Sequence, residues 1–123
     1  MSKVIDSHCH IFVMNGYEFF KDRPLMEYID HFGMEKNAVI ACNERENDEV
    51  IEAVQKYPDK LFGIAYVNVH DMDNSLAKLR EYVKRGIFRG VKMHPYCNDF
   101  QVDDPALFPV YETCIELDIP VLY

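Results

Sequence analysis

The sequence predicts an α/β fold in which strands and helices alternate along the chain. Short apolar runs of the kind found in buried strands recur, and each run except the last is followed by a segment whose apolar residues have helical spacing. No internal repeat, low-complexity tract or Gly/Ser-rich linker divides the 123 residues. We therefore expect one domain with the order (βα)₄β, in which the helices connect parallel strands.

The first half of the chain carries two strand–helix units and a third strand. Its predicted helices end where the sequence favours an end, at Gly33 and before Pro58. The third strand is almost continuously apolar, as is typical of a strand covered on both faces. The predicted strands are 4–8, 38–41 and 61–69, and the predicted helices are 24–32 and 48–57.

The second half repeats the pattern. A helix over 73–86 presents Leu76, Leu79 and Val83 as an apolar stripe, and Gly86 can adopt the left-handed conformation that closes it. In the next predicted helix, Pro109 removes one backbone donor and should delay the regular helix by a turn. The predicted elements are a strand over 88–93, a helix over 105–117 and a final strand over 120–123.

Two architectures fit this order of elements. One is a five-stranded doubly wound sheet, which suits the length of the chain, and the other is the first half of a (β/α)₈ barrel, which normally needs about 250 residues. In both architectures the active site lies beyond the carboxyl ends of the parallel strands. Polar residues at those ends are therefore the candidates for function.

The first strand ends in His8 and His10. Side chains alternate with a period of two along a strand, so both imidazoles project to one side and could bind one metal ion, while Cys9 points away. Neutral imidazole is a good ligand for zinc and similar ions. The pair predicts a metal site, although a His-x-His pair can also arise by chance.

The fourth strand ends in Lys92 and His94, which share a side in the same way. A buried ammonium is costly unless an anion pairs with it, so Lys92 at the mouth of the site indicates an acidic substrate. The alternative is that Lys92 faces outward with its stem over a helix. Asn68 and His70, after the third strand, are weaker candidates.

Composition excludes several classes of function. The chain has 13 basic and 21 acidic residues, a formal net charge of −8, which is the wrong sign for binding nucleic acid. No apolar run approaches the length of a membrane span, and the start lacks an export signal. The 4 cysteines are too few and too irregularly spaced for a disulfide scaffold, so we expect reduced thiols in a cytoplasmic protein.

Several segments together resemble the amidohydrolase superfamily, and within it the amidohydrolase-related metal-dependent hydrolases with a TIM barrel. The resemblance runs in order over the whole chain and is carried by VIDSHCHI at 4–11, GIAYVN at 63–68, RGVKMHP at 89–95, DDP at 103–105 and IPVL at 119–122.

The resemblance implies a fold and a mechanism. It implies that His8 and His10 bind a divalent metal, zinc or manganese, and that Lys92 and His94 assist catalysis at the mouth of the barrel. A water activated by the metal would then hydrolyse an amide, lactone or ester of a small substrate. Some relatives instead remove carbon dioxide from an acid. The rival from another class is a non-catalytic α/β domain that binds a ligand or a partner.

The chain also departs from the family. Members carry a further histidine at the end of strand five and an aspartate at the end of strand eight, whereas residues 1–123 correspond to strands one to five, the N-terminal half of the barrel domain. Strand five would then be an open edge that favours pairing. The expectations are that further strands lie beyond this chain, that two halves associate as a homo-oligomer, or that the chain is structured but inactive.

Overall fold

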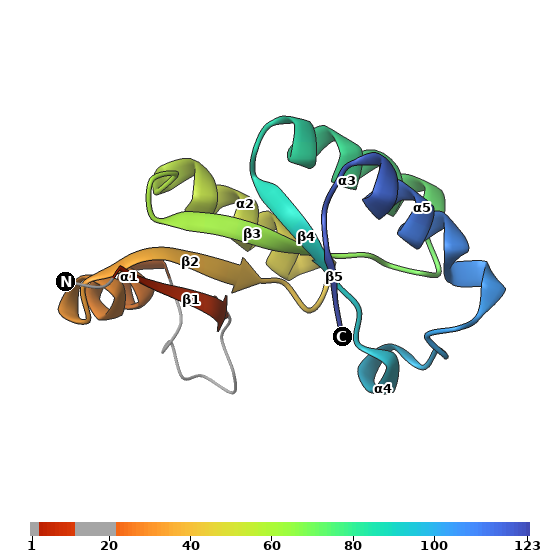
Figure 1. The fold of residues 1–123 in the computed structure, drawn as a ribbon, viewed down its shortest axis with the longest axis horizontal. Coiled ribbons are helices and arrows are strands. Elements are labelled where there is room, and N and C mark those ends of the chain that lie inside the picture. Colours follow the sequence, from red (N-terminus) through yellow and green to blue (C-terminus); the bar gives the residue numbers. More distant parts are fainter. Residues whose placement is uncertain (1–2, 12–21) are drawn as a thin grey trace.

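The computed structural model describes residues 3–11 and 22–123. Strands and helices alternate as predicted (Figure 1). The strands are β1 (Val4–Cys9), β2 (Met34–Ile40), β3 (Leu61–Tyr66), β4 (Phe88–Lys92) and β5 (Val121–Leu122), and the helices are α1 (Asp22–His31), α2 (Glu44–Lys56), α3 (Met72–Lys84), α4 (Pro95–Asn98), the 3₁₀ turn η1 (Pro105–Leu107) and α5 (Phe108–Glu116).

The sheet decides between the two predicted architectures. Its strands are all parallel and lie in the order β1-β2-β3-β4-β5, so each strand is the neighbour of the one before it in the sequence. A doubly wound sheet reverses its strand order at a switch point and carries helices on both faces. The alternative of a doubly wound sheet is therefore wrong, and the five strands form the curled first half of a TIM barrel.

Apolar residues form two layers, one on each face of the curled sheet. The main core lies between the strands and the helices, and it joins residues of α1, α2, α3 and α5 to strand residues such as Val39 and Val91. A smaller cluster of Ala38, Ile40 and Ile64 occupies the opposite, concave face. Residues of β2 thus alternate between the two layers, as the period of a strand requires.

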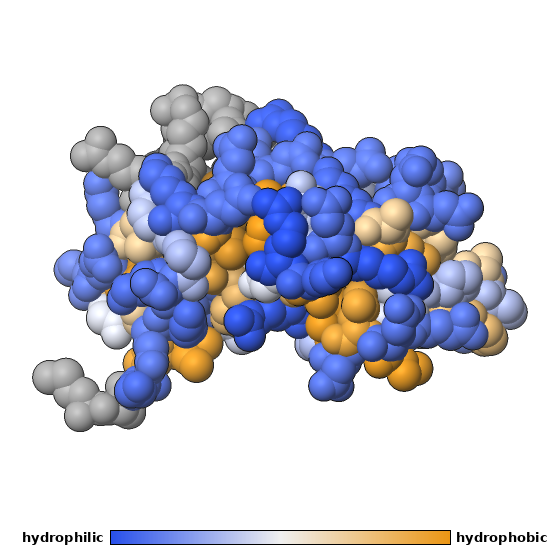
Figure 2. Space-filling view, turned by 90° about the horizontal axis from the view of Figure 1, so that it is seen from above, coloured by the Kyte–Doolittle hydropathy of each residue, from blue (hydrophilic) through white to orange (hydrophobic). Residues whose placement is uncertain are grey.

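The face of the molecule seen from above is mainly polar. Seen from above, hydrophilic side chains cover most of the surface and apolar ones show between them (Figure 2). No helix in the described ranges combines the length and the apolar character that a bilayer crossing requires.

Most helix ends lie where the sequence predicts them. Gly86 has a φ of 76°, the left-handed conformation predicted for it, and Gly33, where a helix end was predicted, has a φ of 60°. The segment before Pro109 is a 3₁₀ turn, and the α-helix starts only at Phe108, which confirms the predicted delay. The structure differs at α2, which begins four residues before the predicted 48, because the Asn43 side chain accepts from the Glu46 N–H at 2.9 Å.

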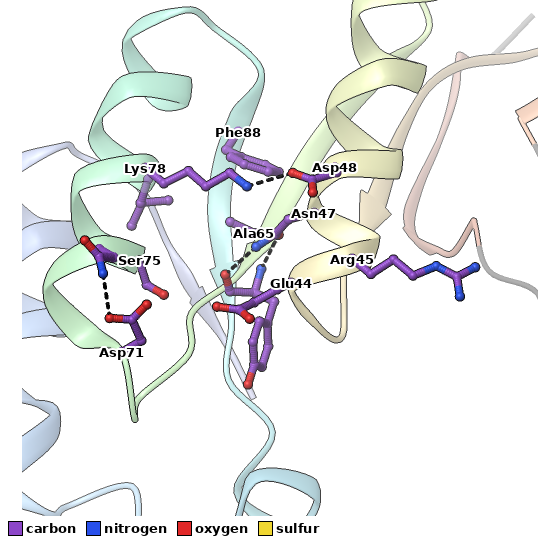
Figure 3. A pocket seen from close by; sticks show the side chains of 12 residues that line it. Glu44, Arg45, Asn47, Asp48, Ala65, Asp71, Ser75, Lys78 and Phe88 are labelled. Carbon is purple, nitrogen blue, oxygen red and sulfur yellow. Dashed lines mark hydrogen bonds and ion pairs between the residues drawn. The ribbon is translucent and has the colours of Figure 1, made fainter.

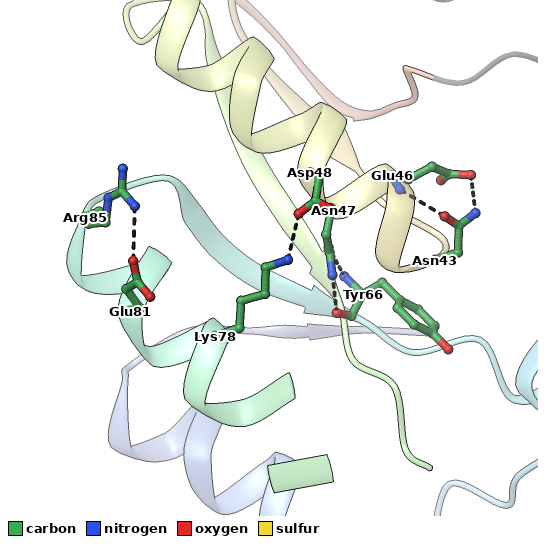
Figure 4. A network of polar contacts seen from close by, with 8 residues as sticks. All are labelled: Asn43, Glu46, Asn47, Asp48, Tyr66, Lys78, Glu81 and Arg85. Carbon is green, nitrogen blue, oxygen red and sulfur yellow. Dashed lines mark hydrogen bonds and ion pairs between the residues drawn. The ribbon is translucent and has the colours of Figure 1, made fainter. Parts of the chain in front are cut away.

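Polar contacts tie α2 to its neighbours (Figure 4). The Asn47 amide donates to the Tyr66 carbonyl at 2.8 Å and accepts from the Tyr66 N–H at 2.9 Å, so it satisfies both backbone groups at the end of β3. Lys78 of α3 forms an ion pair with Asp48 of α2 at 2.7 Å. These contacts fix α2 at the strand ends where the candidate site lies.

A second buried asparagine lacks such partners. Asn37 of β2 is fully buried, and neither atom of its side-chain amide has a hydrogen-bond partner among the described residues. An unsatisfied buried polar group costs about 1–3 kcal/mol.

We expect Asn37→Val to raise the free energy of unfolding by about 1–2 kcal/mol, measured by urea denaturation. The matched control Asn47→Val should lower it by about 2 kcal/mol or more, because Tyr66 loses both partners; equal effects of the two changes would contradict this account.

Candidate functional site

His8 of β1 and His10, directly after the strand, meet on the concave face of the sheet. The Nε2 atoms of His8 and His10 lie 3.1 Å apart. Cys9, between them, packs toward the helices and donates its thiol hydrogen to the Ala38 carbonyl at 3.1 Å. The arrangement predicted from the period of two, with the imidazoles on one side and Cys9 on the other, is present in the structure.

The spacing of the two rings fits a shared metal ion. Zinc lies about 2.0–2.1 Å from each histidine nitrogen, so two ligands of one ion are about 3.4 Å apart in tetrahedral geometry and about 2.9 Å at a right angle. The observed 3.1 Å falls between these values. His8 and His10 are therefore the residues of this chain that could hold a divalent metal.

The surroundings of His10 keep it in the form that binds metals. Its Nδ1 lies 2.9 Å from the Ile40 carbonyl, which can only accept, so Nδ1 carries the hydrogen and Nε2 carries the lone pair. Burial lowers the pKa of the His10 imidazole, and the charges of His8 and Lys92 lower it further. A neutral ring with Nε2 unprotonated follows at neutral pH.

Lys92 is buried on the same side of the sheet as the histidines. Its residue exposure is only 8%, and its ammonium has no hydrogen bond or ion pair with any residue in the described part of the chain. The charge is close enough to His10 and to Cys42 to affect the pKa of both. Of the two orientations considered from the sequence, the structure therefore has Lys92 facing the site.

His94 lies just beyond β4 at the start of α4, a short helix that the sequence analysis missed although Pro95 in its first turn indicates a start. His94 is exposed, and its Nδ1 accepts from the Cys97 N–H at 3.4 Å. Nε2 therefore carries the hydrogen, and it lies 3.7 Å from the Cys97 sulfur. No contact joins His94 to the histidine pair among the described residues.

Sequence reasoning also missed Cys42, whose sulfur lies 3.8 Å from Nδ1 of His10. The signal was its position directly after a buried strand, at the edge where the site was expected. Burial raises the pKa of the Cys42 thiol, and the carboxylate of Glu46 adds to the shift. In the metal-free protein the group is therefore a neutral thiol beside the site.

Asn68 and His70 form hydrogen bonds that hold the loop after β3. Asn68 donates to Glu44 at 3.2 Å and accepts from the His70 N–H at 3.0 Å, which ties the loop to α2 and to itself. Neither residue contacts the histidine pair in the described structure.

Within the described ranges no group of three or more His, Cys, Asp or Glu residues is placed to hold a metal ion.

The structure also has a cavity on the helix side of the sheet. Its volume is about 340 Å³, and it lies between α2 and α3, with the Lys78–Asp48 ion pair across it and Ala65 and Phe88 at its base (Figure 3). Ala65 and Phe88 belong to the main core, so this cavity opens away from the concave face that carries the histidines. It is separate from the candidate metal site.

Comparison with protein families agrees with this geometry. The family model described as Amidohydrolase matches residues 5–122, which is nearly the whole chain. The chain belongs to the amidohydrolase family. Members of this family are enzymes, and in the amidohydrolase superfamily divalent metals support catalysis.

A curated relative and two solved structures show what this family member is similar to. A 2-amino-3-carboxymuconate-6-semialdehyde decarboxylase of Dictyostelium discoideum is 27% identical over 75 residues, which is 61% of this chain and 21% of that protein. A probable 2-pyrone-4,6-dicarboxylic acid hydrolase of Acinetobacter baumannii, solved with citric acid bound, matches with a TM-score of 0.76 and 21% identity over 98% of this chain and 48% of that one.

A 5-carboxyvanillate decarboxylase of Novosphingobium aromaticivorans, solved with manganese and 4-hydroxy-3-methoxy-5-nitrobenzoic acid, matches with a TM-score of 0.68 and 20% identity. The match covers 79% of this chain and 32% of that one. This amidohydrolase chain therefore spans about half the length of the first solved relative and about a fifth of the curated one.

Proposed function

We propose that this amidohydrolase chain contributes the first half of a divalent-metal-dependent enzyme that decarboxylates a small carboxylic acid. The observation that carries the proposal is Lys92: the residue is buried on the same face as the His8–His10 pair, and its ammonium has no hydrogen bond or ion pair with the described residues. A cation at the mouth of the site that pairs with no residue of the described chain can bind an anion, and a substrate carboxylate supplies one. The decarboxylases among the relatives support this reaction.

Each residue has a role in the proposal. His8 and His10 hold the metal, which when bound supplies positive charge that polarises the substrate and can acidify a water ligand. Lys92 binds the substrate carboxylate, and the apolar side chains of Ile40 and Ile64 on the concave face contact its carbon skeleton. Loss of carbon dioxide leaves an electron pair on carbon, and we assign the proton that replaces it to Nε2 of His94.

Hydrolysis is the second candidate and is the reaction that the sequence analysis favoured. The likeness to the pyrone dicarboxylic acid hydrolase supports it. A metal held by the same two histidines would then activate a water that attacks an amide, lactone or ester. Lys92 would again bind an acidic substrate. The two reactions share the roles of His8, His10 and Lys92, but hydrolysis adds a water across the broken bond whereas decarboxylation breaks a carbon–carbon bond and releases carbon dioxide.

Isotopic labelling separates the two reactions. We expect the purified protein, loaded with Mn²⁺ or Zn²⁺, to release ¹³CO₂ from ¹³C-carboxyl-labelled hydroxybenzoates, detected by mass spectrometry. EDTA should abolish the release, and added metal should restore it. Ring opening of an acidic lactone without labelled gas would identify the hydrolase instead. If neither product forms with metal-loaded protein in which the second half of the barrel is also present, the proposed function is wrong.

Three further predictions from the sequence belong to this proposal. Imidazole ligands favour zinc over manganese, so zinc is the predicted resident metal and manganese the alternative, which elemental analysis distinguishes. A cytoplasmic location would fit the unpaired thiols of Cys9, Cys42, Cys97 and Cys114. Association of two halves as a homo-oligomer would cover the edge strands β1 and β5.

A further inference from the structure

The strand that carries the two histidines is interrupted by a β-bulge. Asp6 lies opposite Asn37 of β2, so an uninterrupted register would place His8 opposite Val39. The residue opposite Val39 is instead Cys9. One extra residue of β1 is therefore accommodated between Asp6 and Cys9.

This bulge decides which face of the sheet carries the histidines. Asn37 and Val39 are fully buried, and Val39 belongs to the core under the helices, so the residues opposite them, Asp6 and Cys9, lie toward that layer. Without the extra residue, the period of two would place His8 and His10 on the same side as Asp6. The bulge turns them to the concave face.

A hydrogen bond from Asp6 holds the bulge. Because Cys9 takes the position opposite Val39, the His8 N–H turns to the Asp6 carboxylate, and Oδ1 accepts it at 3.0 Å. This is the local side-chain-to-backbone bond that Asp forms with the residue two positions on. Beyond the bulge, Cys9 and His10 are fixed to the Ala38 and Ile40 carbonyls of β2. His8 has no such bond to β2 within the described structure, so Asp6 is its anchor.

We propose that Asp6 is the positioning residue of the metal site: through the His8 N–H, its carboxylate holds the bulge that turns the His8 ring onto His10. Asp6 does not itself bind the metal, since it lies toward the opposite face. The inference rests on the proposed metal-dependent function and adds to it the residue that assembles the pair. This role also explains why an acidic residue, Asp6, stands two positions before His8.

Cobalt binding tests this role. We expect Asp6→Ala to weaken Co²⁺ affinity by about 10–100-fold, the usual effect of removing a residue that orients a ligand, and to change the visible absorption spectrum of the bound ion. Asp6→Asn keeps the acceptor oxygen and should stay within about threefold of the unmodified protein. Ser7→Ala is the matched control, because Ser7 is exposed, lies in the same bulge and makes no side-chain hydrogen bond among the described residues. An unchanged affinity and spectrum in Asp6→Ala would overturn the proposal.

A measurement without metal separates this inference from the proposed function. Amide hydrogen exchange of the metal-free protein should show a protected His8 N–H in the unmodified protein and in Asp6→Asn, and fast exchange in Asp6→Ala. Fast exchange in the unmodified protein would overturn the role of Asp6, and this readout remains available if Asp6→Ala does not fold. If exchange is protected but the unmodified protein binds no Co²⁺, the metal-dependent function fails while the role of Asp6 in the bulge stands.

Discussion

Replacing both His8 and His10 with alanine is expected to remove the bound metal. The unmodified protein should carry about one equivalent of zinc or manganese after purification, and the double variant should carry essentially none. Loss of a residue that only orients a ligand costs about 10–100-fold in affinity, so loss of two ligands should cost more than that. Elemental analysis by mass spectrometry of extensively dialysed protein measures the outcome.

The matched control is the double replacement of His31 and His70 with alanine. Both are exposed histidines, the first at the end of α1 and the second in the loop after β3, so the control removes the same number of imidazoles from elsewhere on the molecule. Metal content should be unchanged in the control. A similar loss in both variants would indicate binding to surface histidines in general, and unchanged metal in the His8 and His10 variant would reject the metal site.

The second large effect is expected for Lys92→Met, which keeps the aliphatic stem and removes the charge. Removing one partner of a buried ion pair typically costs about 2–5 kcal/mol, so kcat/KM for a carboxylate substrate should fall by about 30–5,000-fold. The free energy of unfolding of the free protein should change little, because the ammonium has no partner among the described residues and is not fully shielded from solvent. Steady-state kinetics and urea denaturation of the same preparations measure the two effects.

Lys60→Met is the control for this substitution. Lys60 is half-buried and donates to the Met34 carbonyl at 3.0 Å, at the end of the sheet opposite the candidate site. Its replacement should lower stability and leave kcat/KM unchanged, the reverse of the pattern at Lys92. If kcat/KM were insensitive to Lys92→Met, the substrate would not be held through this ammonium.

Much of the site could be predicted from sequence because it depends on local rules. The positions of His8, His10, Lys92 and His94 at strand ends follow from the apolar runs that precede them and from the order of elements. Cys42 follows β2 in the same way and could have been found by the same rule. What the sequence could not supply was the distance between the two rings, since that depends on how β1 pairs with β2.

The sequence by itself determined the alternation of strands and helices, because hydrophobic period, Gly33, Gly86 and Pro109 act within a few residues along the chain. The strand order, and with it the choice of a half-barrel over a doubly wound sheet, came only from the tertiary structure, since both folds satisfy the same local pattern. The tertiary structure also decided which face of the sheet His8 and His10 occupy. Alternation along a strand says which residues share a face, but only the register with a neighbouring strand, shifted here by a bulge at Asp6, says which face that is.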